Sequence, residues 1–437
     1  MILRDGLLVG AKNHLFIGGC DTVELANTYG TPLYAMDELY IRQMCHEFVD
    51  AMNLHAPGGL VCYASKAFST VAMCKLIEQE GLGLDVVSGG ELYTALKANF
   101  PMERVTLHGS SKTPYEMRMA VELGVGHIVI DNQCEIPMLQ RIAEEAGRNV
   151  RVQLRLNPGI DIDTHQYIRT AAVDSKFGLG IDDGEALQAT KNIAHCPNLT
   201  LTGVHVHLGS QLFSLDPYIT AIDLLTNFMA LASAITGAEL GEIILGGGFG
   251  VQYTQEDPPA LRPCDIVKAL ARETKRQATR KGLGIPRLMI EPGRMIIAES
   301  GITLYTVSGL KAIPGIRTYL SVDGSMADNP RPAIYGAKYE AILANRANET
   351  PNNTYAIAGH ACESGDIFGY DFRLPHPDIG DILAMFTTGA YHYAMASNYN
   401  RLPVPAVVFC RYGKSEPIVL RQTYEDIVRN DRVPSWM

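Results

Sequence analysis

The chain has 437 residues, more than one compact core usually takes, so we expect two domains. Hydrophobic residues make up 47% of the chain and charged residues 19%, as in an ordinary globular protein. The formal net charge of −10 disfavours nucleic acid or an acidic membrane surface as the main partner, but it leaves room for a local cationic pocket.

The N-terminus and the cysteines point to a cytoplasmic protein. Residues 1–19 lack the apolar run and the small-residue cleavage site of a signal peptide, and no apolar stretch is expected to span a membrane. The nine cysteines occur singly, without a CxxC pair, which is typical of reduced thiols in the cytoplasm. Most of them should be small buried hydrophobes, with Cys362 as the exception.

From residue 33 to residue 299, short apolar runs alternate with amphipathic helical stretches. Eight runs have the length and composition of buried strands: 60–64, 84–87, 105–108, 127–130, 151–156, 203–207, 243–245 and 288–291. Helical patterns fill most of the intervals, for example 70–80, 91–99, 115–123, 135–146 and 217–235. Eight such units predict a closed parallel (β/α)8 barrel, although periodicity alone also allows a doubly wound open sheet.

After residue 299 the pattern changes to β-rich segments separated by Pro and Gly. These segments are 301–307, 318–322, 354–357, 382–386 and 406–410. They predict an antiparallel β-domain over residues 300–437, completed by the N-terminal residues 1–32. No internal repeat and no low-complexity linker separates the two domains.

Polar residues and glycines follow nearly all of the predicted barrel strands. In chain order they are Lys66, Asp85, Ser88, His108, Gly109, Asp131, Arg155, Asn157, His207, Ser210, Gly246–Gly248 and Glu291–Arg294. In (β/α)8 barrels, the carboxyl ends of the strands form the active-site face. A single polar residue at a strand end is usually a cap, but a full ring of them predicts a site.

The glycines at 246–250 (GGGFG) follow the seventh predicted strand, where this architecture often binds phosphate. A glycine triplet alone is more often a tight turn. A dinucleotide site is disfavoured because there is no GxGxxG spacing with a ribose-binding acid. The lysine, the carboxylate and the EPGR segment (291–294) on the same rim favour phosphate.

His205 and His207 lie two residues apart on one strand and therefore share a face. They allow a metal site with a hydrolytic function, completed by Lys66 and Asp131. That interpretation gives no role to the glycine loop or to EPGR. We therefore favour His205 packed inside the barrel and His207 as a flat ring stacked on a flat cofactor, with no metal.

Several long motifs in order resemble the fold-type III decarboxylases that use pyridoxal 5′-phosphate (PLP), and most closely the diaminopimelate decarboxylases of lysine biosynthesis. They are YASKA (63–67), HVHLGSQ (205–211), GGGFG, EPGR, DNPRPAIYGAKYEAILANRA (328–347), CESGD (362–366) and TGAYHYAMASNYNR (388–401). The resemblance covers nearly the whole chain. It implies a barrel with a β-domain, and a homodimer whose active sites lie at the subunit interface.

The resemblance also implies roles for individual residues. Lys66 matches the Schiff-base lysine, His207 the ring-stacking histidine and Glu291 the partner of the pyridine nitrogen. Further cofactor-binding positions are Asp85, Ser210, Gly247, Gly248, Pro292, Gly293, Arg294 and Tyr391. The positions implied for the substrate are Arg294, Arg331, Tyr335, Glu363 and Tyr391. Cys362 matches a proton donor that reaches in from the other subunit.

These residue types suit decarboxylation of a diamino dicarboxylic acid. Loss of CO2 leaves electrons on Cα, which a protonated pyridinium accepts, and a carboxylate beside the ring nitrogen favours that protonated form. The carbanion then needs a proton, for which a thiol is a suitable donor. A second amino-acid head requires a cation for its carboxylate, supplied by Arg331, and an anion for its ammonium, supplied by Glu363. The predicted product is L-lysine.

Two segments depart from the family pattern. HGSSK (108–112) stands where relatives usually read HGNNK, and YIRTAAVDSKFG (167–178), which resembles an active-site lid, lacks a usual glycine and gains Arg169. Decarboxylation of a related or conjugated diamino acid, of the ornithine, lysine or carboxynorspermidine type, therefore remains an alternative. Functions of three further classes also stay open: a fold-type III racemase, a non-catalytic PLP-binding protein and the metal hydrolase.

Overall fold

The computed structural model describes residues 6–10, 12–160, 175–237 and 239–437. The chain forms two compact units. We call residues 42–251 and 259–296 the barrel unit, and residues 1–41, 252–258 and 297–437 the β-unit.

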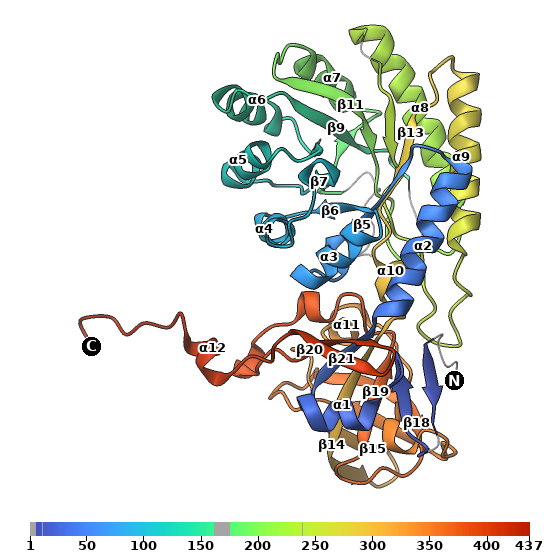
Figure 1. Cartoon of the computed structure of the whole chain (residues 1–437), viewed down its shortest axis with the longest axis vertical. Coiled ribbons are helices and arrows are strands. Elements are labelled where there is room, and N and C mark those ends of the chain that lie inside the picture. Colours follow the sequence, from blue (N-terminus) through green and yellow to red (C-terminus); the bar gives the residue numbers. More distant parts are fainter. Residues whose placement is uncertain (1–5, 11, 161–174, 238) are drawn as a thin grey trace. The chain divides into compact units, whose positions relative to one another are not determined.

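The barrel unit is built around eight parallel strands (Figure 1). They are β5 (Leu60–Ala64), β6 (Gly83–Val86), β7 (Val105–Leu107), β8 (His127–Ile130), β9 (Val150–Asn157), β11 (Leu199–His205), β12 (Glu242–Ile244) and β13 (Arg287–Ile290). Strand β13 pairs with β5, and β8 pairs with β9, so the sheet closes on itself. The predicted barrel is confirmed, and an open sheet is excluded. A short strand, β10 (Leu179–Gly180), adds to β9.

Helices between the strands surround the barrel in Figure 1. They are α3 (Val71–Gln79), α4 (Gly89–Lys97), α5 (Pro114–Leu123), α6 (Glu135–Glu145), α7 (Glu185–Ala194), α8 (Asp216–Thr236) and α9 (Pro263–Arg280). Ser88, one of the predicted strand-end residues, is the N-cap of α4 and accepts a hydrogen bond from the Glu91 amide. Thr113 and Glu116 form a capping box at the start of α5. Local caps thus fix where α4 and α5 begin.

Helix α8 corrects the expectation that no stretch is long and apolar enough to span a membrane. Its 21 residues reach a mean hydropathy of 1.5. One side of the helix is buried within the unit, including Tyr218, Ile222, Leu225 and Met229. The same length and composition are found in core helices, so this feature carries no conclusion about a membrane.

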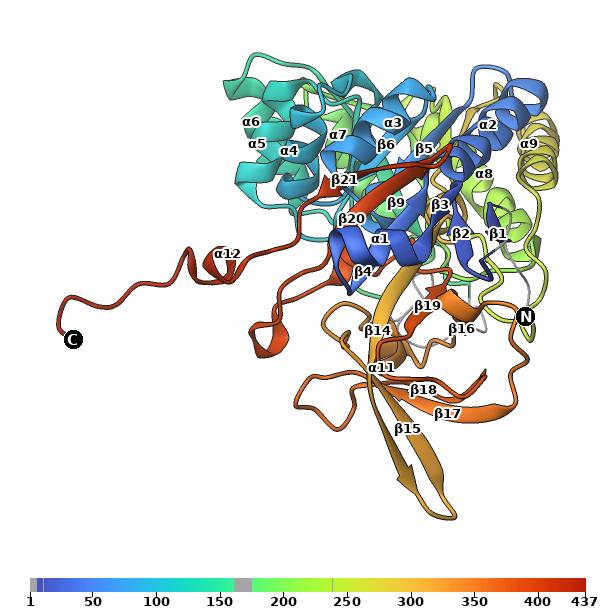
Figure 2. The same cartoon turned by 60° about the horizontal axis from the view of Figure 1, so that its bottom comes forward.

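The β-unit contains a nine-stranded sheet and a small sheet near the N-terminus. The large sheet consists of β4 (Leu33–Asp37), β14 (Gly301–Ile313), β15 (Arg317–Val322), β16 (Ala341–Leu343), β17 (Asn353–Ala358), β18 (Ile367–Leu374), β19 (Ile382–Phe386), β20 (Ala406–Arg411) and β21 (Lys414–Val419). The small sheet comprises β1 (Leu7–Val9), β2 (Leu15–Ile17) and β3 (Cys20–Asp21). Figure 2 shows the long β14–β15 hairpin. The helices α1 (Thr22–Tyr29), α11 (Arg331–Tyr335) and α12 (Tyr424–Val428) belong to the β-unit. The helices α2 (Glu38–His55) and α10 (Arg294–Ile297) lie mostly in the barrel unit.

The large sheet is mixed, which corrects the expectation of a purely antiparallel domain. Strand β4 pairs in parallel with β20, and β15 pairs in parallel with β17. The other pairs in this sheet are antiparallel. Strand β4 also pairs with β14, so residues 33–37 belong to this sheet although the predicted barrel domain began at residue 33. All five residues of β4 are buried, and such a short apolar run looks the same in either domain.

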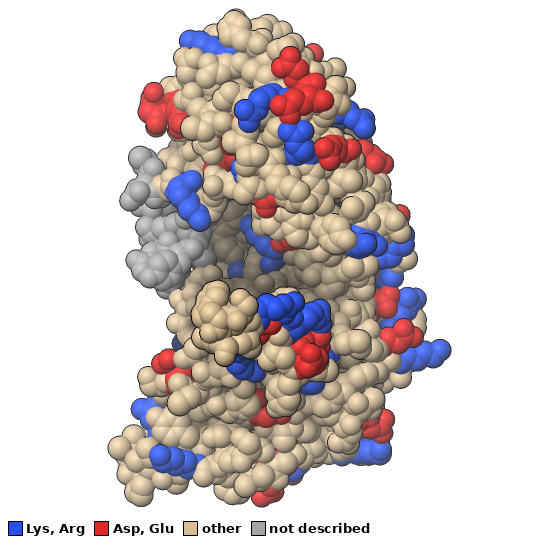
Figure 3. Space-filling view, turned by 90° about the vertical axis from the view of Figure 1, so that its left-hand side faces the viewer, with Lys and Arg blue, Asp and Glu red and all other residues tan. Residues whose placement is uncertain are grey.

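Charges are interspersed on the face of the molecule drawn in Figure 3. Lys and Arg side chains alternate there with Asp and Glu side chains, and among the described atoms of this face neither sign forms an extended patch. Any strong field on this part of the protein must therefore be local, as in a pocket.

A buried charge cluster closes the end of the barrel where the strands begin. Glu242, at the start of β12, accepts hydrogen bonds from Gln153 (2.8 Å) and Thr202 (2.7 Å), and lies 2.9 Å from His127 at the start of β8. Burial alone would raise the pKa of Glu242, but His127, Thr202 and Arg151 lower it to about 2. The carboxylate is thus held ionised at a barrel end that usually serves stability.

We expect Glu242→Gln to lower the free energy of unfolding at pH 7 by about 2 kcal/mol. The folded pKa is depressed, so the carboxylate stabilises the fold fully above its ordinary pKa of 4.5, and this contribution falls as pH drops towards about 2. Urea unfolding followed from pH 7 down to about pH 3 should show the difference nearly constant above about pH 5.5 and shrinking below it. A constant difference across that range would contradict the ionic origin.

Candidate active site

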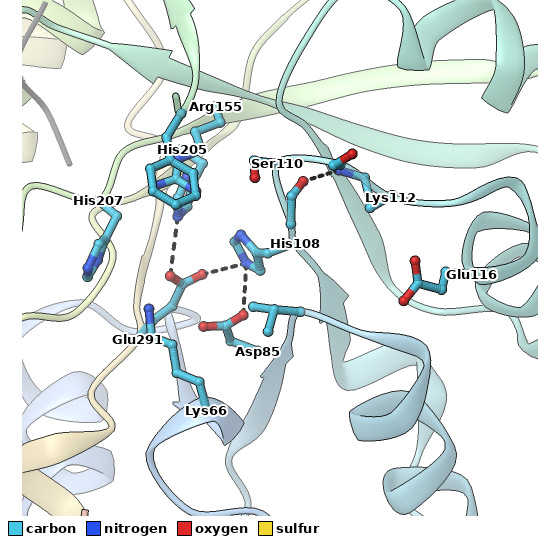
Figure 4. A pocket seen from close by; sticks show the side chains of 14 residues that line it. Lys66, Asp85, His108, Ser110, Lys112, Glu116, Arg155, His205, His207 and Glu291 are labelled. Atoms are coloured by element: carbon cyan, nitrogen blue, oxygen red, sulfur yellow. Dashed lines mark hydrogen bonds and ion pairs between the residues drawn. The ribbon is translucent and has the colours of Figure 1, made fainter. Parts of the chain in front are cut away.

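A cavity of about 430 Å³ opens at the carboxyl ends of the barrel strands (Figure 4). It is lined by Lys66, Asp85, Val87, His108, Gly109, Ser110, Ser111, Lys112, Glu116, Arg155, Phe177, His205, His207 and Glu291. Much of the ring predicted from strand ends therefore converges on one cavity. Asp131 lies behind it and is 3.5 Å from Arg155.

Lys66 projects from the short turn that follows β5 (Figure 4). Within the described ranges, its Nζ forms no hydrogen bond and no ion pair, so the amine is available for chemistry. The hydroxyl of Tyr63 donates to the carbonyl of Phe68 (2.9 Å) and braces the turn. A Cβ on Gly293 would lie 2.9 Å from the Cβ of Ala64, so glycine there lets the loop after β13 pack directly against the lysine turn.

Glu291 is the charged centre of the cavity. One carboxylate oxygen lies 2.9 Å from Nε2 of His108 and the other 3.2 Å from Nε2 of His205 (Figure 4). Burial alone would raise the pKa of Glu291, but the two histidines hold it well below its usual range. The pKa of His108 is lowered by burial but raised further by Glu291 and Asp85, so the net shift is upward. Glu291 is therefore a fixed anion.

The two histidines at the end of β11 occupy different environments, as the sequence predicted. His205 is fully buried and tied to Glu291, and burial lowers its pKa to about 4. His207 lines the cavity, and burial together with Lys66 and Arg155 lowers its pKa well below 6.5. Near neutral pH its imidazole is uncharged. A neutral flat ring at the cavity wall suits stacking on another flat ring.

Two features of the cavity were not among the predicted catalytic or binding residues. The first is His108, which pairs with Glu291 and lies 3.6 Å from Asp85. The second is Arg155, whose guanidinium lies 4.3 Å from the ring centre of Phe177. Both were noted as strand-end residues. The available signals were the position of His108 in the HGSSK segment and that of Arg155 at the end of the predicted strand 151–156.

Three loops beside the cavity bring together a hydroxyl, a glycine-rich backbone and a guanidinium, which are groups that bind anions. The loop after β11 provides Ser210, the loop after β12 provides the glycines, and the loop after β13 provides Arg294, whose Nη2 donates to Oγ of Ser210 (2.8 Å). Gly248 has a φ of +96°, and a Cβ there would collide with the carbonyl oxygen of Gly209. A Cβ on Gly247 would collide with the carbonyl oxygen of Glu291.

The glycines of this loop therefore have a packing reason that the sequence did not reveal. The amide of Gly247 donates to Nδ1 of His207 (3.4 Å), whereas no described residue accepts a hydrogen bond from the amide of Gly248. An unpaired amide beside Arg294 and Ser210 is what a phosphate group requires. Lys66, an ionised Glu291 and a neutral His207 fit the aldehyde and the ring of PLP in the same way.

We expect Arg294→Ala to weaken PLP binding by roughly 10- to 100-fold, because a charge-assisted contact to phosphate is lost. Equilibrium dialysis against PLP measures the change. Arg287→Ala is the matched control, since it removes an arginine from the start of β13, at the opposite end of the barrel strand that precedes Arg294. Equal weakening in the two variants would argue against a phosphate role for Arg294.

In the β-unit, Arg331 is surrounded by tyrosines, including Tyr391, which was predicted for the substrate. This buried arginine donates to the hydroxyl of Tyr339 (2.5 Å), and its guanidinium lies 4.9 Å from the ring centre of Tyr253. Burial would lower its pKa, but Tyr253 and Tyr339 raise it, so the side chain stays cationic. Tyr335 and Tyr391 are half-buried, and Tyr391 has a φ of +62°.

Cys362 and Glu363 are exposed on the turn between β17 and β18. The amide of Cys362 donates to Oδ1 of Asn400 (2.7 Å), and Tyr399 donates to Glu363 (3.2 Å). Hydrogen bonds from Gly365, Tyr399 and Ser364 lower the pKa of Glu363. Cys134 and Cys264 are exposed as well, so exposure does not distinguish Cys362. The buried cysteines are Cys20, Cys45, Cys62, Cys74 and Cys410.

Within the described residues, the geometry suited to a metal ion is His108, His205 and Glu291, whose ligand atoms lie within 4.8 Å of one another. It shares His205 with the set expected from the sequence, which was His205 and His207 completed by Lys66 and Asp131, but has His108 and Glu291 in place of the other three residues. A metal there would occupy the carboxylate and leave Lys66 and the glycine loop without a role.

The comparisons with known proteins agree with this geometry. Residues 40–298 match the family described as "Pyridoxal-dependent decarboxylase, pyridoxal binding domain". The chain is 46% identical over 431 residues to a diaminopimelate decarboxylase of Bacillus subtilis, covering 99% of this chain and 98% of that protein. The chain belongs to the diaminopimelate decarboxylase family.

Solved structures extend the family relationship to the fold. The crystal structure of diaminopimelate decarboxylase from M. jannaschii aligns with a TM-score of 0.91 at 33% identity and covers 99% of each chain. A second structure of that enzyme, in co-complex with L-lysine, aligns with the same TM-score over 98% of each chain. As a member of this family, the chain is a PLP-dependent amino-acid decarboxylase.

Proposed function

We propose that this enzyme decarboxylates meso-2,6-diaminopimelate to L-lysine and CO2, the last step of lysine biosynthesis, in the cytoplasm. The observation that carries the proposal is the Glu291 carboxylate, held ionised by His108 and His205 in the same cavity as Lys66. Relatives named for this reaction match the chain over almost its full length.

Bound PLP supplies the electron sink for the carbanion that remains at Cα after CO2 leaves. Lys66 would hold the cofactor through its aldehyde. Glu291 would favour the protonated form of the pyridine nitrogen, and a second carboxylate, Asp85, lies in the same cavity. His207 would supply a neutral flat ring beside that of the cofactor.

The phosphate of the cofactor is held by the three loops beside the cavity. Ser210 and Arg294 supply side-chain donors, and Gly247 and Gly248 supply backbone amides. Pro292 and Gly293 set the path of the loop against the lysine turn. Tyr391, a residue of the β-unit, is the remaining position that we propose for the cofactor.

Recognition of the far end of the substrate requires both charges of an amino-acid head. Arg331 binds the distal carboxylate with Tyr335 beside it, and Arg294 is a second cation for it. Glu363 binds the distal ammonium. Cys362 donates the proton to Cα. Because Cys362 and Glu363 are exposed, we propose that they act in the active site of a second copy, in a homodimer with shared sites.

The test is an assay of the purified protein with PLP and meso-diaminopimelate, with ornithine, lysine and arginine as competing substrates. We expect L-lysine and CO2 from diaminopimelate, with kcat/KM at least about 100-fold higher than for the other three. None of those three has a distal carboxylate to pair with Arg331. Comparable turnover of ornithine or lysine would establish the alternative, a related diamino acid.

One feature of the sequence, the HGSSK segment (108–112), supports a related diamino acid as the substrate. HGSSK lies at the cavity wall, where Ser110 and Ser111 line it. The other departure, residues 167–174 with Arg169, lies outside the described residues.

Hybrid dimers test the shared site. Lys66→Ala and Cys362→Ala chains are each expected to be nearly inactive alone, and mixing them restores one intact site in each hybrid. Cys264→Ala, which removes another exposed thiol, serves as the control for Cys362→Ala. No recovery of activity on mixing would overturn the shared site.

A further inference from the structure

The last residues of the chain form an exposed apolar segment, which we call the C-terminal arm (residues 420–437). Figures 1 and 2 both show it leaving β21 and extending past α12 as an open chain. Its large apolar side chains are exposed: Leu420, Tyr424, Val428, Val433, Trp436 and Met437. Trp436 is 84% exposed, and it is the only tryptophan of the protein. Such a concentration of exposed apolar groups marks an interaction surface.

The arm carries more local structure than a solvated tail needs. Thr423 and Asp426 form a capping box at the start of α12, and Arg401 donates to Asp431 (2.8 Å) near the end of the arm. Tyr424 and Val428 are four residues apart and therefore lie on one side of the helix. A helix of five residues is not stable alone, so a contact on that apolar side is required to hold it.

The start of the C-terminal arm is hydrogen-bonded to residues 398–401, which also bind the turn that carries Cys362. Asn398 binds Gln422 (2.6 Å) at the start of the arm, and Arg401 donates to the carbonyl of Ile427 (3.3 Å). The same short segment holds the thiol turn, because Asn400 accepts from the amide of Cys362 (2.7 Å).

The linking segment has an unusual backbone. Asn400 and Arg401 both have a left-handed φ, +52° and +59°. This conformation is uncommon for two successive residues other than glycine, and it persists only where surrounding contacts impose it. The thiol turn and the arm are therefore parts of one structured surface of the β-unit.

We propose that the C-terminal arm docks on a second copy of this chain, with Trp436 buried in the contact. The inference rests on the proposed function, because a thiol turn that enters the active site of a second copy brings the arm beside it onto that copy. The charges of the arm favour a protein over a lipid surface: its cations Arg421, Arg429 and Arg432 are matched by Glu425, Asp426 and Asp431. A lipid-binding segment carries an excess of cations.

The experiment follows the PLP-loaded enzyme through a dilution series. Sedimentation equilibrium gives the dimer dissociation constant, and the emission of Trp436 reports its environment in the same samples. We expect emission typical of a buried indole in the dimer, shifting to the red on dilution with the midpoint of dissociation. We also expect Tyr424→Ser/Trp436→Ser, and deletion of residues 424–437, to raise the dissociation constant at least tenfold.

Two controls make the result specific. Trp436→Phe keeps an apolar ring and should leave the dissociation constant within a few-fold of the unaltered enzyme. Leu54→Ser/Ile285→Ser removes two exposed apolar side chains from the barrel unit and should not change it.

Three results would overturn the proposal. They are water-exposed emission from a dimer at every concentration, an unchanged dissociation constant after deletion of the arm, and a blue shift that appears only with anionic vesicles. The hybrid assay of Lys66→Ala with Cys362→Ala separates the two hypotheses. If hybrids recover activity while the arm variants dimerise normally, the proposed function stands and the arm inference fails.

Discussion

Lys66→Ala is expected to abolish the visible absorbance of bound PLP and to lower kcat by roughly 10³-fold or more, as for loss of a residue that bonds covalently in a reaction. The structure places this amine in a cavity with Glu291 and His207, and within the described ranges it is engaged by no other side chain. No other cavity-lining lysine can replace it, because Nζ of Lys112 is 2.8 Å from Glu135 and donates to two backbone carbonyls. Absorbance spectra and steady-state rates measure the two effects.

The control is Lys66→Arg, which keeps a cation but cannot bond to the aldehyde carbon. It should resemble the alanine variant in spectrum and rate while the circular dichroism of both stays unchanged. If either variant retained the visible band, Lys66 would not be the anchor. Stoichiometric zinc in the purified protein, with no PLP absorbance at all, would instead support a metal at His108, His205 and Glu291.

The barrel could be predicted because the sequence pattern of each strand is contained within a few consecutive residues. Each strand is a short apolar run, and the predicted strand 127–130 coincides with β8. The β-unit was harder, because its pairings join distant segments: β4 near residue 35 pairs with β20 near residue 408. Nothing local distinguishes a strand of that kind from a barrel strand. Strands β18 and β21 were missed because both have exposed, polar positions interrupting their apolar pattern.

The active site, too, could be predicted only in part from the sequence. The strand-end rule brings Lys66, His207 and Glu291 into one cavity without any knowledge of distance. It could not reveal that His108, which follows β7, meets Glu291, which follows β13, because that contact depends on barrel closure. The packing role of the glycines was hidden for the same reason. A Cβ at Gly247 is excluded by a carbonyl oxygen 44 positions further along the chain, at Glu291.

Among the described residues of the barrel strands and their ends, Glu242 and Glu291 are buried glutamates that each contact histidine, one at either end of the barrel. Glu242 meets His127 where the strands begin, and Glu291 meets His108 and His205 where they finish. Both carboxylates have lowered pKa values, yet hydrogen bonds from Gln153 and Thr202 further satisfy Glu242. Glu291 faces a cavity. The pair offers a matched comparison of a carboxylate that stabilises the fold with one that serves the reaction.

Glu291→Gln is expected to lower kcat by about 10²- to 10⁴-fold while PLP still binds, because the anion that keeps the pyridine nitrogen protonated is lost. Since the pKa of Glu291 is well below its usual range, the loss should be the same at pH 6 and pH 8. The visible spectrum of the bound cofactor should change, as its ring nitrogen loses the proton. Glu291→Asp, which keeps the charge, should recover part of kcat, whereas a purely structural role would be served about as well by glutamine.

Glu242→Gln is the comparison that decides the interpretation. It removes a buried carboxylate of similar chemistry, so it should lower the free energy of unfolding without changing the cofactor spectrum, and kcat should fall no more than a few-fold. His108 adds a second readout: burial lowers its pKa, but Glu291 and Asp85 raise it overall. The stabilisation from His108 is complete below its ordinary pKa of 6.5 and is lost as pH rises through the raised value, so Glu291→Gln should flatten the pH dependence of unfolding there. Near-normal turnover in Glu291→Gln, or a spectral change in Glu242→Gln, would remove Glu291 from its role at the ring nitrogen.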